Sequence, residues 1–186
     1  MSDKIKKEFH YFLLTDYDKE EVFLRKRHKE GWKFLQVKLP GIYYFEKCGA
    51  EDVVYRLDFN PQNPSEKQKY IRMFEDYGWE YLQDMNEYSY FRKAAKKCAE
   101  KDTEIFSDNE SRLAMLKRIF NKRMVPILIV FLLCVFPQVI KMLEMEVVSG
   151  FDIAFLAVFG AMFAVYLGIV GWCMCGFIRL KRKYKN

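Results

Sequence analysis

The sequence predicts an α+β protein in which a tandem strand–helix–strand–strand repeat forms an antiparallel sheet with two helices, followed by a two-helix transmembrane hairpin. The first observation is an internal repeat: residues 22–36 (VFLRKRHKEGWKFLQ) align with residues 69–83 (KYIRMFEDYGWEYLQ) at a fixed offset of 47. The second is a pair of long segments without charge, residues 124–140 and 153–178. A duplicated soluble module and a membrane anchor therefore share one chain.

The first unit, about residues 5–48, has a recognisable order of elements. Alternating aromatic and apolar residues predict a strand over 9–14. Asp16 or Asp18 can cap a following helix, and Gly31 can end it in a left-handed conformation. Strands are then expected over 32–37 and 42–47, joined by a turn at Leu39-Pro40-Gly41.

The second unit, about residues 52–94, repeats this order. Strands are expected over 53–59, 79–84 and 88–93, with a helix that starts at Pro64-Ser65 and ends at Gly78. The two units make up a module over residues 1–95. We expect them to pair edge to edge into one continuous sheet.

The middle strand of each unit carries the candidate binding residues. Side chains alternate across a strand, so each unit is expected to present an aromatic–aromatic–glutamine stripe, with Leu35 and Leu82 pointing the other way under their helices. Either the stripes pack on each other as core, or they border a groove for a ligand or partner. The groove residues are Trp32, Phe34, Gln36, Trp79, Tyr81 and Gln83.

Charges that flank the two apolar segments predict their orientation. Cytoplasmic flanks of spans collect Lys and Arg, and here basic residues precede the first span and follow the second. The loop between the spans carries Glu144, Glu146 and Asp152. We therefore expect a two-span protein of the cell membrane with both termini in the cytoplasm. The membrane-surface residues are Arg118, Lys122, Arg123, Arg179, Lys181, Arg182 and Lys183.

The net charge of +6 comes from these flanks, because residues 1–100 hold 19 basic and 18 acidic side chains. Direct nucleic-acid binding is therefore disfavoured. Residues 96–123 are expected to form a linker and an amphipathic helix that begins at a capping box, Ser107 to Glu110. This helix either lies on the membrane surface or packs on the module. Residues 179–186 form a basic tail.

Small residues recur within the second span. Gly160, Ala164 and Gly168 are four residues apart, a spacing that lets helices approach closely. They pack either on the first span or on a second copy of the chain. Residues 124–140 and 153–178 hold no ionisable side chain of the kind that a pore or pump uses at the membrane midplane, which argues against both.

Catalytic signals are weak. The two histidines, His10 and His28, have no metal-site spacing and are expected to be ordinary surface or edge residues. The five cysteines form no CxxC pair, and no phosphate loop or nucleophile elbow is present. We expect no enzyme, no cofactor and no metal.

The tandem order with its EGW and YGW junctions, together with the basic-flanked spans, resembles a family of uncharacterised bacterial membrane proteins. Its members share an N-terminal domain of unknown function and are often encoded beside PadR-type regulators. The duplicated unit is also similar to GyrI-like domains, which enclose ligands between aromatic walls and use a buried Glu. Here Glu80 alternates with Trp79 and Tyr81, so it is expected to point away from the stripe.

Two functions are compatible with these observations. The first is a membrane-anchored cytoplasmic sensor or regulatory adaptor that binds a ligand or partner, such as a transcriptional regulator, through the aromatic-lined module. The second is an accessory or scaffold subunit whose module is a protein-interaction surface. Membrane lipid and a second copy are further expected partners. A cleft between the stripes favours the first function, whereas a packed core with an exposed apolar patch elsewhere favours the second.

Overall fold

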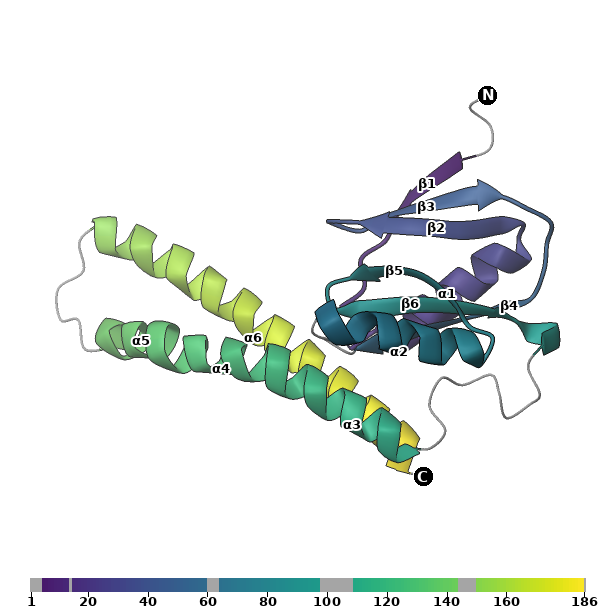
Figure 1. Cartoon of the computed structure of the whole chain (residues 1–186). Coiled ribbons are helices and arrows are strands. Elements are labelled where there is room, and N and C mark those ends of the chain that lie inside the picture. Colours follow the sequence, from purple (N-terminus) through teal and green to yellow (C-terminus); the bar gives the residue numbers. More distant parts are fainter. Residues whose placement is uncertain (1–4, 14, 60–63, 98–108, 144–149, 186) are drawn as a thin grey trace. The chain divides into compact units, whose positions relative to one another are not determined.

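The computed structural model describes residues 5–13, 15–59, 64–97, 109–143 and 150–185 (Figure 1). The chain divides into two compact units, Met1–Met115 and Leu116–Asn186. Residues 98–108 of the predicted linker, with Ser107 of the capping box, lie outside the described residues. Glu144 and Glu146 of the loop between the spans lie outside them as well.

The first sheet, sheet A, consists of β1 (Ile5–Phe9), β2 (Trp32–Lys38) and β3 (Ile42–Lys47) in the order β1-β3-β2. All neighbours in it are antiparallel. Helix α1 (Tyr17–Lys29) covers one face, where the Phe23 ring lies 5.5 Å from Tyr43 and 6.0 Å from Phe45. Aromatic burial of this kind holds the helix to the sheet.

The first strand lies earlier than the alternation of residues 9–14 predicts, so that prediction is wrong. Strand β1 pairs with β3 from Ile5 to Phe9. Its alternation is inverted: Ile5 and Phe9 are 56% and 65% exposed, whereas the Glu8 side chain faces α1 and is only 11% exposed. A search for alternating hydrophobic residues misses a strand of this kind, because its inward-facing residues are charged.

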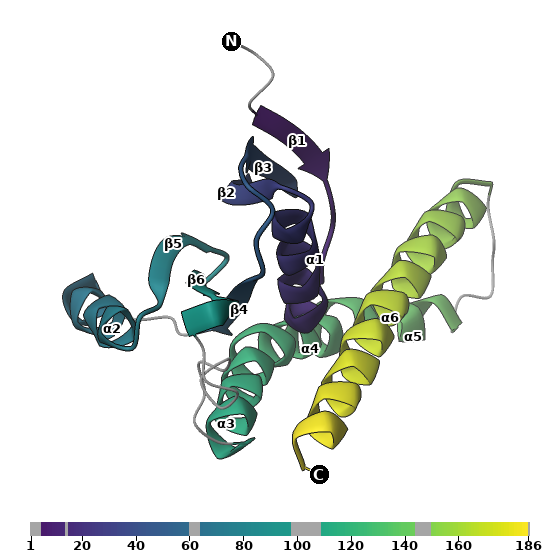
Figure 2. The same ribbon diagram turned by 90° about the vertical axis from the view of Figure 1, so that its right-hand side faces the viewer.

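The second sheet, sheet B, consists of β4 (Val53–Phe59), β5 (Glu80–Met85) and β6 (Tyr88–Ala94) in the order β4-β6-β5. Helix α2 (Pro64–Asp76) packs on one face over Val54 and Phe91. Helix α1 lies against the other face, where its His28 meets Tyr55. Sheet B therefore lies between the two helices (Figure 2). The short helix η1 (Ala95–Lys97) follows β6.

The prediction of one continuous sheet is wrong, because the structure has two three-stranded sheets. Strands β2 and β5 approach each other without a backbone ladder. A side chain joins them instead: the Val37 N–H donates to Oε1 of Gln83 at 3.2 Å, and Nε2 of Gln83 donates to the Val37 carbonyl at 3.4 Å. Both edge strands carry a bulge, which bends a strand and interrupts pairing.

Glycines end both helices as predicted. Gly31 has φ +85° and Gly78 has φ +78°, the left-handed region that favours glycine. A Cβ on Gly31 would lie 3.1 Å from the carbonyl oxygen of Cys48. The same atom on Gly78 would make an ordinary 3.6 Å contact with Lys93.

The last part of the chain is a helical hairpin, whose first helix begins within the first unit and continues into the second. Helix α3 (Asn109–Ile119) continues through η2 (Phe120–Met124), α4 (Val125–Val130), η3 (Phe131–Val135) and α5 (Phe136–Leu143), and α6 (Gly150–Lys185) returns. The two helical stretches Glu110–Gln138 and Ala157–Lys183 each contain an 18-residue window of mean hydropathy 2.0, so they are long and apolar enough to cross a membrane. Ring pairs Phe120–Phe177 and Phe131–Phe163 show that the helices run antiparallel.

Candidate functional site

Phe34, predicted to line a groove, fills the contact between the two sheets. Its side chain is fully buried, and its ring stacks on Tyr90 of sheet B at 5.7 Å and meets Tyr55 at 6.3 Å. Trp32 lies on the same face nearer the edge, half-buried, with the Lys6 ammonium 5.4 Å from its ring. In the first unit, the predicted aromatic stripe is therefore part of the core.

The aromatic residues of the second stripe belong to a different layer. Trp79 is 4% exposed in the cluster that α2 forms with Phe74 and Phe91. Tyr81 is half-buried against Phe91, at 5.7 Å between ring centroids. Phe34 and Trp79 therefore lie on opposite sides of sheet B rather than across one groove.

Bulges move both glutamines off their stripes, so the predicted aromatic–aromatic–glutamine face is wrong in each unit. Phe34 pairs with Phe45, but Gln36 pairs with Tyr44, and adjacent residues of β3 point to opposite faces. Gln36 is therefore on the face opposite Phe34. Leu35 is 36% exposed rather than covered by α1.

The second bulge has the same effect. Tyr81 pairs with Phe91, whereas Gln83 pairs with Tyr90. The side chain of Gln83 thus points toward sheet A, where it bonds to Val37. Gln83 joins the two sheets and does not line a binding groove.

A buried carboxylate that the sequence analysis missed lies between the sheets. Glu20 of α1 is 6% exposed, and its Oε1 accepts hydrogen bonds from the hydroxyls of Tyr43 at 2.7 Å and Tyr90 at 2.6 Å. Burial raises the pKa of Glu20, against the two hydrogen bonds, and it also raises the pKa of both tyrosines. One acid thereby connects α1, sheet A and sheet B. Glu20 falls within α1, outside both predicted stripes.

His28 corrects another expectation, because it is buried rather than a surface residue. Its Nδ1 lies 2.7 Å from the Tyr55 hydroxyl of sheet B. Burial lowers the pKa of His28, and the charge of Arg92 adds to the effect. Next to it, hydrogen bonds from Arg25 lower the pKa of Asp52 to about 2. These contacts hold α1 on the first residues of β4.

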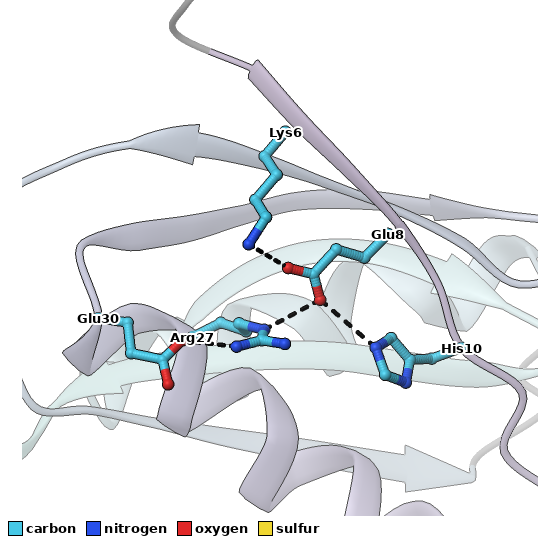
Figure 3. A network of polar contacts seen from close by, with 5 residues as sticks. All are labelled: Lys6, Glu8, His10, Arg27 and Glu30. Atoms are coloured by element: carbon cyan, nitrogen blue, oxygen red, sulfur yellow. Dashed lines mark hydrogen bonds and ion pairs between the residues drawn. The ribbon is translucent and has the colours of Figure 1, made fainter.

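Charged side chains also fix β1 to α1 (Figure 3). Glu8 contacts Lys6 at 2.6 Å and Arg27 at 3.0 Å, and Nε2 of His10 lies 3.4 Å from it. Partial burial raises the pKa of Glu8, but Lys6 and Arg27 outweigh it, so the pKa is lowered overall. Glu30 binds the far side of Arg27 at 2.6 Å. The network occupies the inner face of β1 and leaves its outer face to the apolar residues.

Among the described residues no helix covers the outer face of sheet A, the face opposite α1, and this face mixes apolar with basic groups. Ile5 and Phe9 of β1 are exposed, and the Tyr44 ring of β3 lies between two ammonium groups, Lys7 at 5.4 Å and Lys38 at 5.6 Å. Each pair is within cation–π distance. Among the residues that the structure describes, this surface is one exposed apolar patch of the module.

The predicted membrane-surface residues gather at one end of the helical hairpin. Because the two helices are antiparallel, the first residues of the hairpin and the last residues of α6 lie together. Lys122, Arg179, Lys181, Arg182 and Lys183 are exposed, whereas Arg118 and Arg123 are half-buried.

The small residues of the second span do not pack on the first span within the described residues. Gly160, Ala164 and Gly168 are exposed, and no atom lies within 4 Å of a Cβ built on either glycine. Phe163 and Tyr166 make the contact instead, each stacking on Phe131, and the Tyr166 hydroxyl donates to the Ile127 carbonyl. The small-residue row therefore faces away from the hairpin partner.

Metal chemistry has no support in the part of the chain that the structure describes. No group of three or more His, Cys, Asp or Glu side chains is placed there to hold a metal ion. The cysteines at 48, 134, 173 and 175 are free thiols.

Comparison with known families gives an identity at the level of the family. The model for a protein of unknown function (DUF2812) matches residues 16–130, more than half of the chain. The chain therefore belongs to this family, and the expectation of an uncharacterised family is confirmed. No curated protein and no solved structure matches it. The match runs from α1 to the first membrane-length helix and includes every strand of the two sheets except β1, which precedes it.

Proposed function

We propose that this member of the DUF2812 family is a membrane-anchored adaptor whose N-terminal module binds another protein at its surface. The observation that carries the proposal is the state of the two stripes. Phe34 is packed between the sheets, and Trp79 is packed under α2. A packed core with an exposed apolar patch elsewhere is the pattern of a protein-interaction surface, not of a ligand cleft.

The proposal includes a duplicated module. Both sheets have the same strand order, the edge strands β2 and β5 each have a bulge one residue before a glutamine, and both helices end at a glycine of positive φ. These shared features support a common origin of the two units. They also let one unit serve as a template for the contacts of the other.

The proposal includes an orientation as well. Two helices of membrane-spanning length, with basic residues gathered at one end of the hairpin, support a cytoplasmic position for that end. The module precedes the first helix at this end, so it meets cytoplasmic proteins. A transcriptional regulator is one such partner, as the resemblance to a family of uncharacterised bacterial membrane proteins implies.

An accessory or scaffold subunit is the second candidate function. The same exposed face favours it, because a scaffold also needs a surface that its own fold leaves uncovered. The two functions differ in whether the partner is soluble or is itself part of a membrane complex. One purification separates them.

The test is affinity purification from membranes in mild detergent. The full chain is compared with a chain reduced to residues 109–186, brought to the same level in the membrane. We expect at least one protein to co-purify with the full chain and to be absent from the shortened chain. A soluble partner supports the adaptor function. An integral membrane partner supports the scaffold function. Identical protein sets from both chains would refute the proposal.

A further inference from the structure

The two sheets differ in how many of their faces are covered. Sheet B has a helix on each side: α2 packs over Val54, and α1 packs against the face that carries Tyr55. Sheet A has α1 on its inner face, while its outer face carries the exposed Ile5 and Phe9. The outer face of sheet A therefore corresponds to the face of sheet B that α1 covers.

Strand pairing gives the correspondence residue by residue. Tyr90 faces Leu57 in sheet B, and Tyr44 faces Lys7 in sheet A. At the next outward position along the first strand of each sheet stands a phenylalanine. Phe59 of sheet B is fully buried and Phe9 of sheet A is 65% exposed.

The glutamines after the bulges correspond in the same way. Gln83 joins β5 to the backbone of Val37 in β2, across the contact between the sheets. Gln36 occupies the equivalent position on the outer face of sheet A. Within the part of the chain that the structure describes, its side-chain amide has no hydrogen-bond partner.

Helix α1 is the element that covers the corresponding face of sheet B. One of its faces is buried, at Tyr17, Glu20, Leu24 and His28, and it presents two adjacent acids to sheet B. Glu20 accepts from the Tyr90 hydroxyl at 2.6 Å, and Glu21 accepts from the Leu57 N–H at 2.9 Å and from Arg56 at 3.2 Å. Acids on a helix thus meet hydroxyl, amide and basic groups on the sheet.

The outer face of sheet A offers basic groups at the corresponding places. Lys7 and Lys38 are exposed on either side of Tyr44. Lys33 also lies on this face, where it pairs with Glu46 at 3.0 Å. Three lysines against one glutamate make the surface complementary to an acidic helix.

We propose that the outer face of sheet A binds an amphipathic helix of a partner protein, whose acidic side chains meet Lys7 and Lys38 beside Tyr44. The inference rests on the adaptor function proposed above and names its binding site. The helix lies on sheet A as α1 lies on sheet B, with apolar side chains against Ile5 and Phe9. Helix-on-sheet packing buries both apolar faces.

Charge disfavours a second copy of this chain as the occupant. Stacking of copies would place α2 of one on sheet A of the next. At the positions that Glu20 and Glu21 occupy in α1, the repeat places Lys67 and Gln68 in α2. Lys67 already pairs with Asp84 of its own sheet, so α2 has no acid at these positions to meet Lys7 and Lys38 and lacks the charge complementarity that favours association.

The experiment is photo-crosslinking of the full chain in its native membrane. The photoreactive residue p-benzoylphenylalanine replaces Phe9 or Tyr44, and in a control it replaces Tyr77, which is 72% exposed just after α2. We expect positions 9 and 44 to give adducts with one protein, within a helical segment that carries adjacent acids. The control position should give no adduct with that segment.

Charge reversal tests the recognition itself. The double variant Lys7→Glu with Lys38→Glu should lower the adduct yield about tenfold. Changing the partner's acids to lysine should restore it. An unchanged thermal melt of the variant shows that the module remains folded, because both lysines are exposed.

Each other outcome overturns the binding site. Adducts with lipid alone, adducts with a second copy, equal adducts from position 77, or no adducts all contradict an acidic helix on this face. If a protein still co-purifies with the full chain but not with residues 109–186, the adaptor function stands and only the site is wrong. If nothing co-purifies, the adaptor function fails.

Discussion

Replacing Phe34 with alanine tests whether the contact between the sheets is a core. The ring is fully buried and lies 5.7–6.3 Å from four other rings, those of Tyr43, Phe45, Tyr55 and Tyr90. Removing a buried phenylalanine costs about 3–5 kcal/mol. Because two separate sheets border the cavity, we expect the upper part of this range, a large share of the roughly 5–15 kcal/mol that stabilises a domain.

Trp32→Ala is the matched control, since Trp32 lies on the same face of β2 but is only half-buried. Loss of part of its apolar area and of its contact with Lys6 costs about 1–2 kcal/mol. The assay is urea unfolding of the full chain in detergent, followed by tryptophan fluorescence. Trp79 lies just before β5, and Trp172 lies in α6, so both proteins are made with Trp172→Phe to assign the remaining fluorescence change to the two sheets.

Comparing the stability lost by the two variants decides whether Phe34 lies in a core or lines a groove. If Phe34→Ala lowers the free energy of unfolding by less than about 1 kcal/mol, or by no more than Trp32→Ala does, the contact between the sheets is not a core. The reasoning from Phe34 to a filled stripe would then be refuted. A groove for a ligand would again be the better account of these aromatic residues.

Three further outcomes are expected. Gly31→Ala should lower the free energy of unfolding by about 1–2 kcal/mol because of the positive φ. This loss should exceed that of Gly78→Ala, because a Cβ at position 31 meets a backbone oxygen at 3.1 Å, whereas a Cβ at position 78 meets a flexible lysine. Urea unfolding of both variants tests this. The stability of Glu20→Gln relative to wild type should rise as the pH rises above 4.5. Folding raises the pKa of Glu20, so this carboxyl stabilises the wild-type fold at low pH and loses that contribution at higher pH. A stability difference between the two proteins that does not change with pH would contradict this. A C-terminal reporter should be active in the cytoplasm, and a tag in the loop from Glu144 to Asp152 should be labelled from outside; the reverse pattern would overturn the orientation.

The order of the elements was readable from the sequence because local signals agree with it. Strands β3 and β4 begin and end where predicted, and α2 begins at Pro64. Glycines of positive φ end both helices, as Gly31 and Gly78 indicate. Turn and helix-end chemistry act over a few residues, so a single sequence displays them directly. The two apolar helices are equally direct, because length and composition alone define them.

The candidate site was not readable in the same way, because it depends on register. One extra residue at each bulge moves every later side chain of the strand to the opposite face of the sheet. The residues around Leu35 and Leu82 give no sequence signal of a bulge. Burial of Glu20 was equally hidden. A glutamate in the first turn of a helix normally faces water, and only the folded chain brings Tyr43 and Tyr90 to it.

The inverted strand β1 links the missed prediction to the proposed function. Its inward residue Glu8 is neutralised by Lys6 and Arg27, so the strand is held by pairing and charge rather than by its apolar side chains. Ile5 and Phe9 consequently contribute little to the fold, while sheet B buries Tyr55 and Phe59 at the matching places. A strand that keeps its apolar side chains outside leaves a surface that the fold itself does not need. That surface is available to a partner without loss of stability.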